Sequence, residues 1–393
     1  MKTKKICITL FLISHFTLSM AQIPDPTWNK QSGLKGCDFY TDVIEDLNQG
    51  YTVTGAVNVE GNSFDFSINR FNTNGDLLWS KKIGNENKEI PKRLVQLIDK
   101  SYVLIGSSYA DEKQQCLLIR VDENGDDFWK NTLGEEYLNL ADIVALDENS
   151  FAIVGSKGED PDHPKPWMAV MDENGEIVWE KIFENDFNGC ANSIKKLPGG
   201  DFAIAAQVSE TGKNNCDILA IRTNNKGEAK WFSRIKTPDQ KVWPECICCS
   251  PDSCLMIVGW NGKCLNDINS ADPIFDYDLV LNKISASGEI VWTKNVTREG
   301  SEGGNALTIL PDGTFIVAGI KATSYLGKVG PWLLGVDADG NEHSEKLLRL
   351  HFNNDHAARI INSTDGGFVV IGPGIQEETN TRSDGWVMKF GNL

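Results

Sequence analysis

The chain has little histidine, few basic residues and no stretch with the hydrophobic period of an amphipathic helix. Only five histidines occur among 393 residues, and none lies near the cysteine-rich segment, so no structural zinc site is expected. After residue 21, no segment is apolar enough to span a bilayer. Acidic residues outnumber basic ones by 55 to 38, and the resulting charge of −17 argues against nucleic acid as a partner.

The first 21 residues are typical of a secretory signal peptide. A start with three lysines precedes a short apolar run from residue 6 to residue 18, and Ser19-Met20-Ala21 fits a cleavage site. The mature chain would begin at Gln22, so residues 22–393 are expected to form one domain. We expect an exported protein, periplasmic or extracellular, that is a monomer and does not insert into a membrane.

Tryptophans recur at a nearly constant step of 50 to 52 residues, with one longer step of 61. A period near 50 that runs from end to end indicates an array of one repeated unit. The repeated tryptophans are Trp28, Trp79, Trp129, Trp179, Trp231 and Trp292.

Each unit predicts four short antiparallel strands. In the second unit the expected strands are 93–98, 102–106, 116–121 and 127–133, and the last two are joined by a turn that contains Asn124-Gly125. Asn-Gly is a strong hairpin signal because both residues accept positive φ. Four such strands describe a blade of a β-propeller, and the tryptophan four residues after each hairpin glycine would be a wedge between blades.

The two ends of the chain predict how the array closes. The unit after Trp292 has Ser344 where tryptophan is expected, and the last unit lacks a fourth strand. The segment around Trp28 resembles an orphan fourth strand. Docking of this segment on the last blade would close a ring of seven blades and remove two open sheet edges. The expected fold is therefore an all-β, seven-bladed propeller of four-stranded antiparallel blades.

Two resemblances follow from these motifs. The segments 364–372 and 172–179 are similar to the repeats of secreted bacterial β-propeller proteins, which implies the fold but hardly any function. Glycine followed by tryptophan four residues later also resembles the tryptophan-docking propellers of quinoproteins, and Cys248-Cys249 adds to that similarity. This second resemblance implies a quinone cofactor, with calcium, although the family's metal ligands cannot be placed on this sequence.

The longest predicted loop, between Trp260 and Asp276 of the fifth blade, is the first candidate binding site. An aromatic side chain with carboxylates and amides suits a sugar or a cation, whereas the alternative is an insertion that the fold tolerates. The candidate residues in this loop are Trp260, Asn261, Asp267, Asp272 and Asp276. His351 and His356, which flank Asn353 to Asp355, are the other candidates because a His/Asp pair could transfer protons.

Matched positions of four first strands carry charges of alternating sign. These residues are Asp42, Arg93, Asp142 and Arg359. Ion pairs between neighbouring blades are the favoured interpretation, and a ring of ligand-binding charges in the channel is the alternative.

Ten cysteines and the predicted export make disulfides possible. Cys249 and Cys254 flank a turn and could bridge paired strands. Cys246 with Cys264, and Cys190 with Cys216, are further candidate pairs, whereas a vicinal bond between Cys248 and Cys249 is a less favoured alternative.

No pattern of residues identifies a catalytic or metal-binding centre, and none is predicted. The segment from Asp337 to Gly340 resembles half a calcium loop, but a hairpin explains it. The sequence favours an exported, non-enzymatic binding or scaffold protein with a glycan, peptide or protein ligand on the loop face around the channel mouth. The alternative is an exported enzyme that acts on a polysaccharide or carries a quinone cofactor, which would need paired carboxylates in the mouth.

Overall fold

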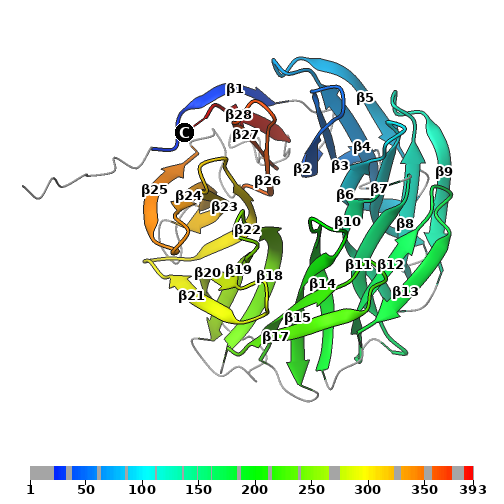
Figure 1. Cartoon of the computed structure of the whole chain (residues 1–393). Coiled ribbons are helices and arrows are strands. Elements are labelled where there is room, and N and C mark those ends of the chain that lie inside the picture. Colours follow the sequence, from blue (N-terminus) through cyan, green and yellow to red (C-terminus); the bar gives the residue numbers. More distant parts are fainter. Residues whose placement is uncertain are drawn as a thin grey trace, which may run out of the picture.

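The sheets of the chain are arranged radially around a central axis, as the blades of a propeller are (Figure 1). We call this ring of blades the wheel. This computed structural model describes residues 22–31, 38–59, 63–84, 87–110, 113–134, 137–147, 149–160, 162–183, 187–210, 215–237, 240–264, 275–322, 329–348, 356–373 and 385–392. Over these ranges the chain has 28 strands and no helix. The strands form seven four-stranded antiparallel sheets. The seven-bladed propeller predicted by the repeat is confirmed. None of the described residues belongs to a helix that could cross a membrane.

The two inner strands of each blade surround the axis. The innermost strands are β2 (Asp38–Glu45), β6 (Lys88–Gln96), β10 (Leu138–Ala145), β14 (Phe187–Lys196), β18 (Gln240–Cys249), β22 (Glu302–Ile309) and β26 (Arg359–Asn362). The second strands are β3 (Tyr51–Val59), β7 (Tyr102–Ala110), β11 (Phe151–Lys157), β15 (Phe202–Glu210), β19 (Leu255–Cys264), β23 (Phe315–Ala322) and β27 (Phe368–Gly372).

The two outer strands of each blade form the rim. The third strands are β4 (Ser63–Phe71), β8 (Lys113–Val121), β12 (Lys165–Met171), β16 (Asp217–Thr223), β20 (Phe275–Ile284), β24 (Val329–Val336) and β28 (Trp386–Phe390). The outermost strands are β5 (Leu77–Ile83), β9 (Asp127–Leu133), β13 (Ile177–Ile182), β17 (Ala229–Ile235), β21 (Ile290–Val296), β25 (Glu342–Leu347) and β1 (Pro26–Gln31).

Several strands extend further than the sequence predicted. In blade two the first strand begins at Lys88 instead of residue 93, and the third begins at Lys113 instead of residue 116. The additional residues are mostly polar, so they lack the apolar pattern of a core strand, yet their backbones continue the ladder. They lie on the loop face, which carries the connections between blades and those between second and third strands.

The N-terminal strand closes the ring as predicted. β1 pairs antiparallel with β28, with Trp28 opposite Lys389 and Gln31 opposite Trp386. Thr27 Oγ1 also donates a hydrogen bond to the carbonyl of Lys389 at 3.1 Å. The last blade is therefore built from both ends of the described chain, in the order β1-β28-β27-β26.

The tryptophan of an outermost strand packs on the hairpin glycine of the next blade. Gly125 has φ of 80°, and a Cβ added to it would lie 3.0 Å from Trp79 Cζ3. Glycine is therefore needed here both for the turn and for the approach of the indole. The same contact pairs Trp28 with Gly75, Trp129 with Gly175, Trp179 with Gly227, Trp231 with Gly288 and Trp292 with Gly340.

The interface between blades six and seven lacks this contact because Ser344 replaces tryptophan. Residues near the N-terminus contribute to it instead. Ile23 is 5% exposed and belongs to the core cluster shared by these two blades. Lys346 Nζ lies 2.6 Å from Asp25 Oδ1. The N-terminal segment thus supports a second interface besides the strand that it adds.

Innermost strands carry a bulge at a matched position. In β6 the register shifts between Pro91 and Arg93, so that Lys92 is the extra residue. A Cβ on Gly106, which lies opposite Pro91, would come within 2.2 Å of the carbonyl oxygen of Ile90, and this explains the glycine that ends the apolar run of the second strand. A bulge re-aims the residue that follows it. We call the residues at the matched position after the bulge the channel ring: Asp42, Arg93, Asp142, Ser193, Cys246, Ala306 and Arg359.

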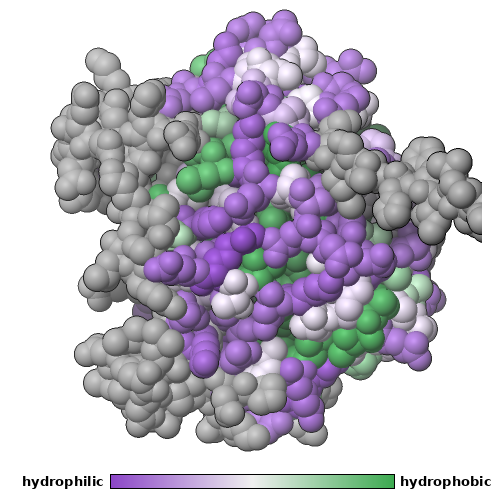
Figure 2. Space-filling view, turned by 90° about the vertical axis from the view of Figure 1, so that its left-hand side faces the viewer, coloured by the Kyte–Doolittle hydropathy of each residue, from purple (hydrophilic) through white to green (hydrophobic). Residues whose placement is uncertain are grey.

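The side of the wheel shown in Figure 2 is mainly hydrophilic, with scattered hydrophobic patches. Around the rim, exposed apolar side chains stand directly before the docking tryptophans. They include Leu78, Phe128, Val178 and Val291, which are 52 to 62% exposed. Their alternation with the indoles follows from the period of two along a strand, so the indole faces the neighbouring blade and the preceding side chain faces away.

Removing the N-terminal strand should abolish the stability of the fold. A variant that begins at Leu34 lacks β1, and we expect it to lose several kcal/mol, which is on the order of the whole stability of a typical domain. Urea unfolding followed by tryptophan fluorescence measures the loss. The matched control begins at Gln22 and should unfold like the full chain, whereas equal midpoints for the two variants would contradict ring closure by β1.

Candidate functional site

Charged side chains of the channel ring form a network at the centre of the wheel. Arg359 Nε lies 3.1 Å from Asp42 Oδ1, and Arg359 Nη2 lies 3.8 Å from Asp142 Oδ1. Arg93 Nε lies 3.5 Å from the same Asp142 oxygen. The structure thus brings all four predicted charges together in ion pairs.

The ring carboxylates also bind the backbone of the next blade. Asp42 Oδ2 accepts a hydrogen bond from the backbone N–H of Leu94 at 3.0 Å. Asp142 Oδ2 accepts one from the backbone N–H of Ile194 at 3.0 Å and one from Ser193 Oγ at 2.9 Å. Each carboxylate therefore links its own blade to the following one.

Buried charges of this kind are strongly coupled. Burial by itself would raise the pKa of Asp142, but Arg359 and Arg93 outweigh it and hold that pKa below its usual value. For Arg359, burial would lower the pKa, and the carboxylates of Asp42 and Asp142 reverse this effect. These side chains have their partners within the ring, so the geometry favours structural ion pairs over a ligand-binding ring.

The described cysteines are not bonded to one another, and strand register explains why. Cys249 lies opposite Leu255, whereas the backbone N–H of Ser250 bonds to the carbonyl of Cys254. Neighbouring positions of a strand point to opposite faces, so Cys249 and Cys254 cannot meet as predicted. The cysteines that are free in the structure are Cys116, Cys190, Cys216, Cys246, Cys248, Cys249 and Cys254.

The two other predicted cysteine pairs are too far apart. Cys246 lies opposite Val258, and Cys264 stands six residues further along β19, about 20 Å away at the rise of a strand. Cys190 is on β14, whereas Cys216 directly precedes β16, which pairs with the far edge of β15. Two strand spacings are about 10 Å, beyond the reach of a disulfide.

Three aromatic rings form one cluster at the loop-face end of blade five. Trp243, Trp260 and Tyr277 stand on the neighbouring strands β18, β19 and β20, and Trp243 lies opposite Trp260. The ring of Tyr277 is 5.9 Å from each indole. All three side chains are partly exposed. The sequence analysis identified only Trp260 as a candidate, because the pairing register of the strands is what brings the other two rings next to it.

Trp260 is held in place by the next two blades. Its Nε1 donates to Asn305 Oδ1 at 3.0 Å, and Asn305 Nδ2 donates to the carbonyl of Ala357 at 3.0 Å. The indole also covers Gly303, where an added Cβ would lie 2.3 Å from Trp260 Cδ2. Asn305 is the extra residue of the bulge in β22, so the same bulge that shapes the channel also orients this indole.

The other predicted residues of the blade-five loop lie apart from this cluster or outside the described residues. Asn261 is 2% exposed and, next to Trp260 on the strand, points to the opposite face. Asp276 lies opposite Lys263 at the start of β20. His356 directly precedes Ala357, and burial lowers the pKa of its imidazole. Asp267, Asp272 and His351 lie outside the described residues.

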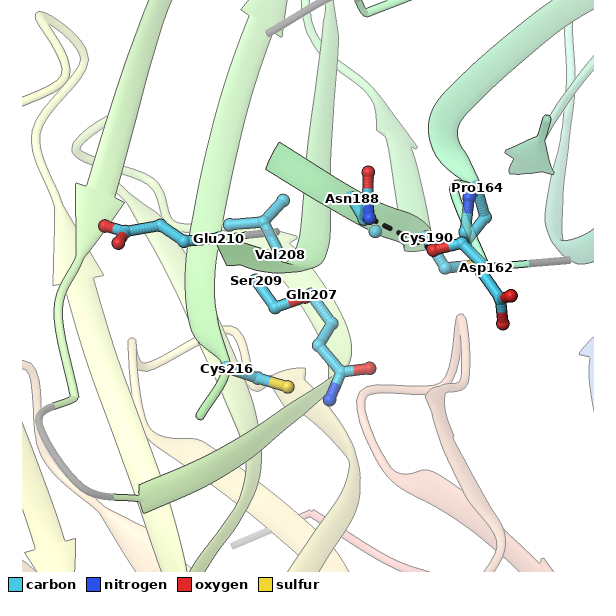
Figure 3. A pocket seen from close by; sticks show the side chains of 10 residues that line it. Asp162, Pro164, Asn188, Cys190, Gln207, Val208, Ser209, Glu210 and Cys216 are labelled. Carbon is cyan, nitrogen blue, oxygen red and sulfur yellow. Dashed lines mark hydrogen bonds between the residues drawn. The ribbon is translucent and has the colours of Figure 1, made fainter. Parts of the chain in front are cut away.

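A polar pocket of about 400 Å³ lies between blades three and four on the loop face (Figure 3). Gln207 connects this pocket to blade five, because its Nε2 donates to the carbonyl of Val242, the residue before Trp243, at 2.9 Å. Asn188 Nδ2 donates to the carbonyl of Asp162 at 3.1 Å and closes the opposite wall. Amides and carboxylates thus line the pocket, and one of the amides also bonds to the strand that carries Trp243.

The carboxylates of this pocket do not converge. Figure 3 shows Asp162 and Glu210 at opposite ends, with their carboxyl groups pointing away from each other. Arg234 Nη2 also lies 3.1 Å from Glu210 Oε1. Hydrolysis of a glycosidic bond needs two carboxyl groups that face the same bond, so the pair here suits ligand contact better than catalysis.

Glu302, at the start of β22, is a buried carboxyl group that the sequence analysis missed. Its side chain has no exposed surface, and neither oxygen accepts a well-formed hydrogen bond from a described residue. Burial raises the pKa of Glu302 to about 7, against the opposing charges of Lys321 and Arg298. Glu89 occupies the matched position of β6, and burial likewise raises its pKa to about 7. This match appears only once the bulges are aligned.

No group of three or more histidine, cysteine or acidic side chains among the described residues is arranged to hold a metal ion. The calcium suggested by the distant resemblance therefore has no such group among these residues.

Comparisons with known proteins extend the result for the fold. No family model matches the chain, and no curated protein matches its sequence. An ulvan-specific polysaccharide lyase bound to -[GlcA(1-4)Rha3S]- is 9% identical, with 92% of this chain and 97% of that chain covered and a TM-score of 0.58. The WD40 domain of Neurospora crassa Pan2 is 12% identical, with coverages of 95% and 98% and a TM-score of 0.55. The polysaccharide lyase Uly1 is 11% identical, with coverages of 89% and 89% and a TM-score of 0.55. Identities this low establish similarity of the propeller fold alone.

Loss of the central arginine should destabilise the fold strongly. In Arg359→Met, Asp42 and Asp142 lose a buried partner, and we expect a loss of about 3–5 kcal/mol in the free energy of unfolding. The control is Lys30→Met, because Lys30 and Asp76 form an exposed pair whose loss should cost less than about 1 kcal/mol. Urea unfolding measures both, and similar small losses would contradict a structural role for the ring.

The buried Glu302 should make stability depend on pH. Its folded pKa of about 7 exceeds the ordinary value of 4.5, so the folded state binds more protons between these pH values and stability falls as pH rises through them. Glu302→Gln stays neutral, so its stability relative to the wild type should increase from pH 4.5 to 7 and then level off. Thermal unfolding from pH 4 to 8 tests this.

Glu345→Gln is the matched control with the opposite sign. Burial would raise the pKa of Glu345, but its hydrogen bond to Lys321 and the charges of Lys321 and Arg298 lower it overall. This variant should lose stability relative to the wild type as the pH rises. A pH-independent difference between the wild type and Glu302→Gln would show that Glu302 is not protonated preferentially in the fold.

Proposed function

We propose that this protein is an exported, non-enzymatic binding protein for a neutral oligosaccharide. In this proposal the ligand lies on the loop face of blades three to five, with sugar rings on the aromatic cluster and hydroxyl groups in the polar pocket. The observation that carries the proposal is the hydrogen bond that connects the pocket to the strand of Trp243. Gln207 forms a wall of the pocket and bonds to the residue before Trp243.

The chemistry of the surface supports a sugar ligand. Sugar rings have apolar C–H faces and polar edges, so they suit partly exposed aromatic rings beside amides and carboxylates. Trp260 is held by its indole N–H and by Gly303, which reduces the ordering cost of binding. A rigid scaffold that positions such residues at its loops is a common arrangement for recognition.

Charge supports a neutral rather than an acidic glycan. Asp162 and Glu210 line the pocket, and the whole chain carries a net charge of −17. A polymer rich in uronic acid or sulfate would be repelled by this surface. The lyase bound to a glucuronate-containing ligand shares the fold with this protein, and its type of ligand does not match the charge here.

Binding to oligosaccharides of different charge tests the proposal. The mature protein, beginning at Gln22, is screened on an array of neutral and acidic oligosaccharides, and hits are measured by isothermal titration calorimetry. We expect neutral ligands to bind and Trp243→Ala to weaken binding at least about tenfold, which corresponds to about 1.4 kcal/mol. Phe128→Ala is the control, because this exposed ring lies on the rim of blade two.

Two results would contradict the proposal. One is the absence of any neutral hit, and the other is unchanged affinity in both Trp243→Ala and Trp260→Ala. Release of new reducing ends or unsaturated products from a bound polysaccharide would instead favour the alternative of an exported enzyme. Export itself is tested by N-terminal sequencing of the secreted protein, which should begin at Gln22.

A further inference from the structure

The opposite face of the wheel carries a second, larger cavity. It has a volume of about 710 Å³ and is formed where the innermost strands of blades four to seven end. We call it the turn-face cavity, because the turns from first to second strands border it. The channel ring lies between the turn-face cavity and the loop face. The cavity is therefore separate from the proposed glycan site.

The lining of the turn-face cavity is predominantly apolar. Aliphatic side chains from blades six and seven, and prolines of the turns from blades four to six, contribute most of the wall. They are Pro198, Pro251, Leu307, Ile309, Leu310, Pro311, Ile360 and Ile361. A cavity of this size with apolar walls lies within the range of small-molecule sites.

The pairing register of the strands places one cationic side chain, Lys195, at the turn-face cavity. Residues two positions beyond the channel ring share one level on the seven innermost strands, and Lys195 is the only charged member among them. The residues at this level are Ile44, Val95, Val144, Lys195, Cys248, Thr308 and Ile361.

The ammonium of Lys195 is not neutralised by an ion pair in the described part of the chain. Together with Arg359 and Arg93, it helps to lower the pKa of Asp142. Lys195 therefore offers a cation to the cavity, although the protein as a whole is strongly acidic.

We propose that the turn-face cavity binds a small amphipathic carboxylate, with the carboxylate at Lys195 and the alkyl chain along Leu307, Ile309 and Ile361. The ammonium of Lys195, which is partly exposed, would form a charge-assisted hydrogen bond with the carboxylate. Burial of the alkyl chain adds a contribution that grows with each methylene group. Charge complementarity selects an anion, and the apolar wall selects against inorganic anions.

Calorimetry with short-chain probes tests the assignment. Decanoate should bind the mature protein at one site, octanoate should bind more weakly, and decyltrimethylammonium should not bind. Lys195→Met should weaken decanoate binding on the order of tenfold or more, because it removes the charge while keeping an apolar side chain. Lys195→Arg keeps the charge and should retain binding.

Two control variants test whether the effect is specific to Lys195 and to this face of the wheel. Lys196 is the next residue, and its ammonium pairs with Asp147 at 2.9 Å, so Lys196→Met removes a neighbouring charge that the site does not use and should bind like the wild type. Trp243→Ala should also bind decanoate normally, which distinguishes this site from the loop face. Unfolding midpoints of all variants show that they are folded.

Three results would overturn the inference. Saturable binding of decanoate could be absent, decyltrimethylammonium could bind as tightly as decanoate, or Lys195→Met could keep wild-type affinity. If Lys195→Met is unfolded, Ile361→Asp provides the second test, because a carboxylate in the wall should repel decanoate. Unchanged affinity in Ile361→Asp would equally overturn it.

Discussion

The contact on which the wheel depends is an indole lying on the glycine of a neighbouring hairpin. Only a residue without a Cβ can both adopt the positive φ of the turn and let the ring approach, as Gly125 does for Trp79. The contact joins the outermost strand of one blade to the third-to-fourth-strand turn of the next. Repeated at six of the seven interfaces, it sets the spacing of the blades and buries aromatic surface between them.

A second constraint acts at the inner edge of each blade. The bulge in an innermost strand brings its backbone so close to the second strand that glycine is required there, as at Gly106. The same bulge aims one side chain per blade at the axis. Ion pairs such as Arg359 with Asp42 then join blades that are far apart in sequence. The blades are thus held at the rim by apolar packing and at the axis by charge.

The proposed glycan site lies on the loop face, where blade five carries the longest predicted loop. Trp260 could be found in the sequence because that predicted loop begins at it, although the structure places it within β19. Trp243 and Tyr277 could not, because each sits in a strand where an aromatic residue is ordinary, and only register brings them to Trp260. Register also explains the failure of the disulfide predictions: it places Cys249 and Cys254 on opposite faces and holds the other two pairs too far apart.

The sequence by itself determined the number of blades, the strand order within each and the closure by the N-terminal strand. These features are local and repeated, so hairpin glycines, tryptophans and the orphan strand around Trp28 encode them directly. It also aligned Asp42, Arg93, Asp142 and Arg359, because they share one position of the repeat. Only the tertiary structure decided how blades face each other, and hence that Gln207 reaches Val242 and that Lys195 lines a cavity with aliphatic side chains of blades six and seven. Contacts between blades depend on twist and register over some fifty residues of separation, and no local pattern in the chain records them.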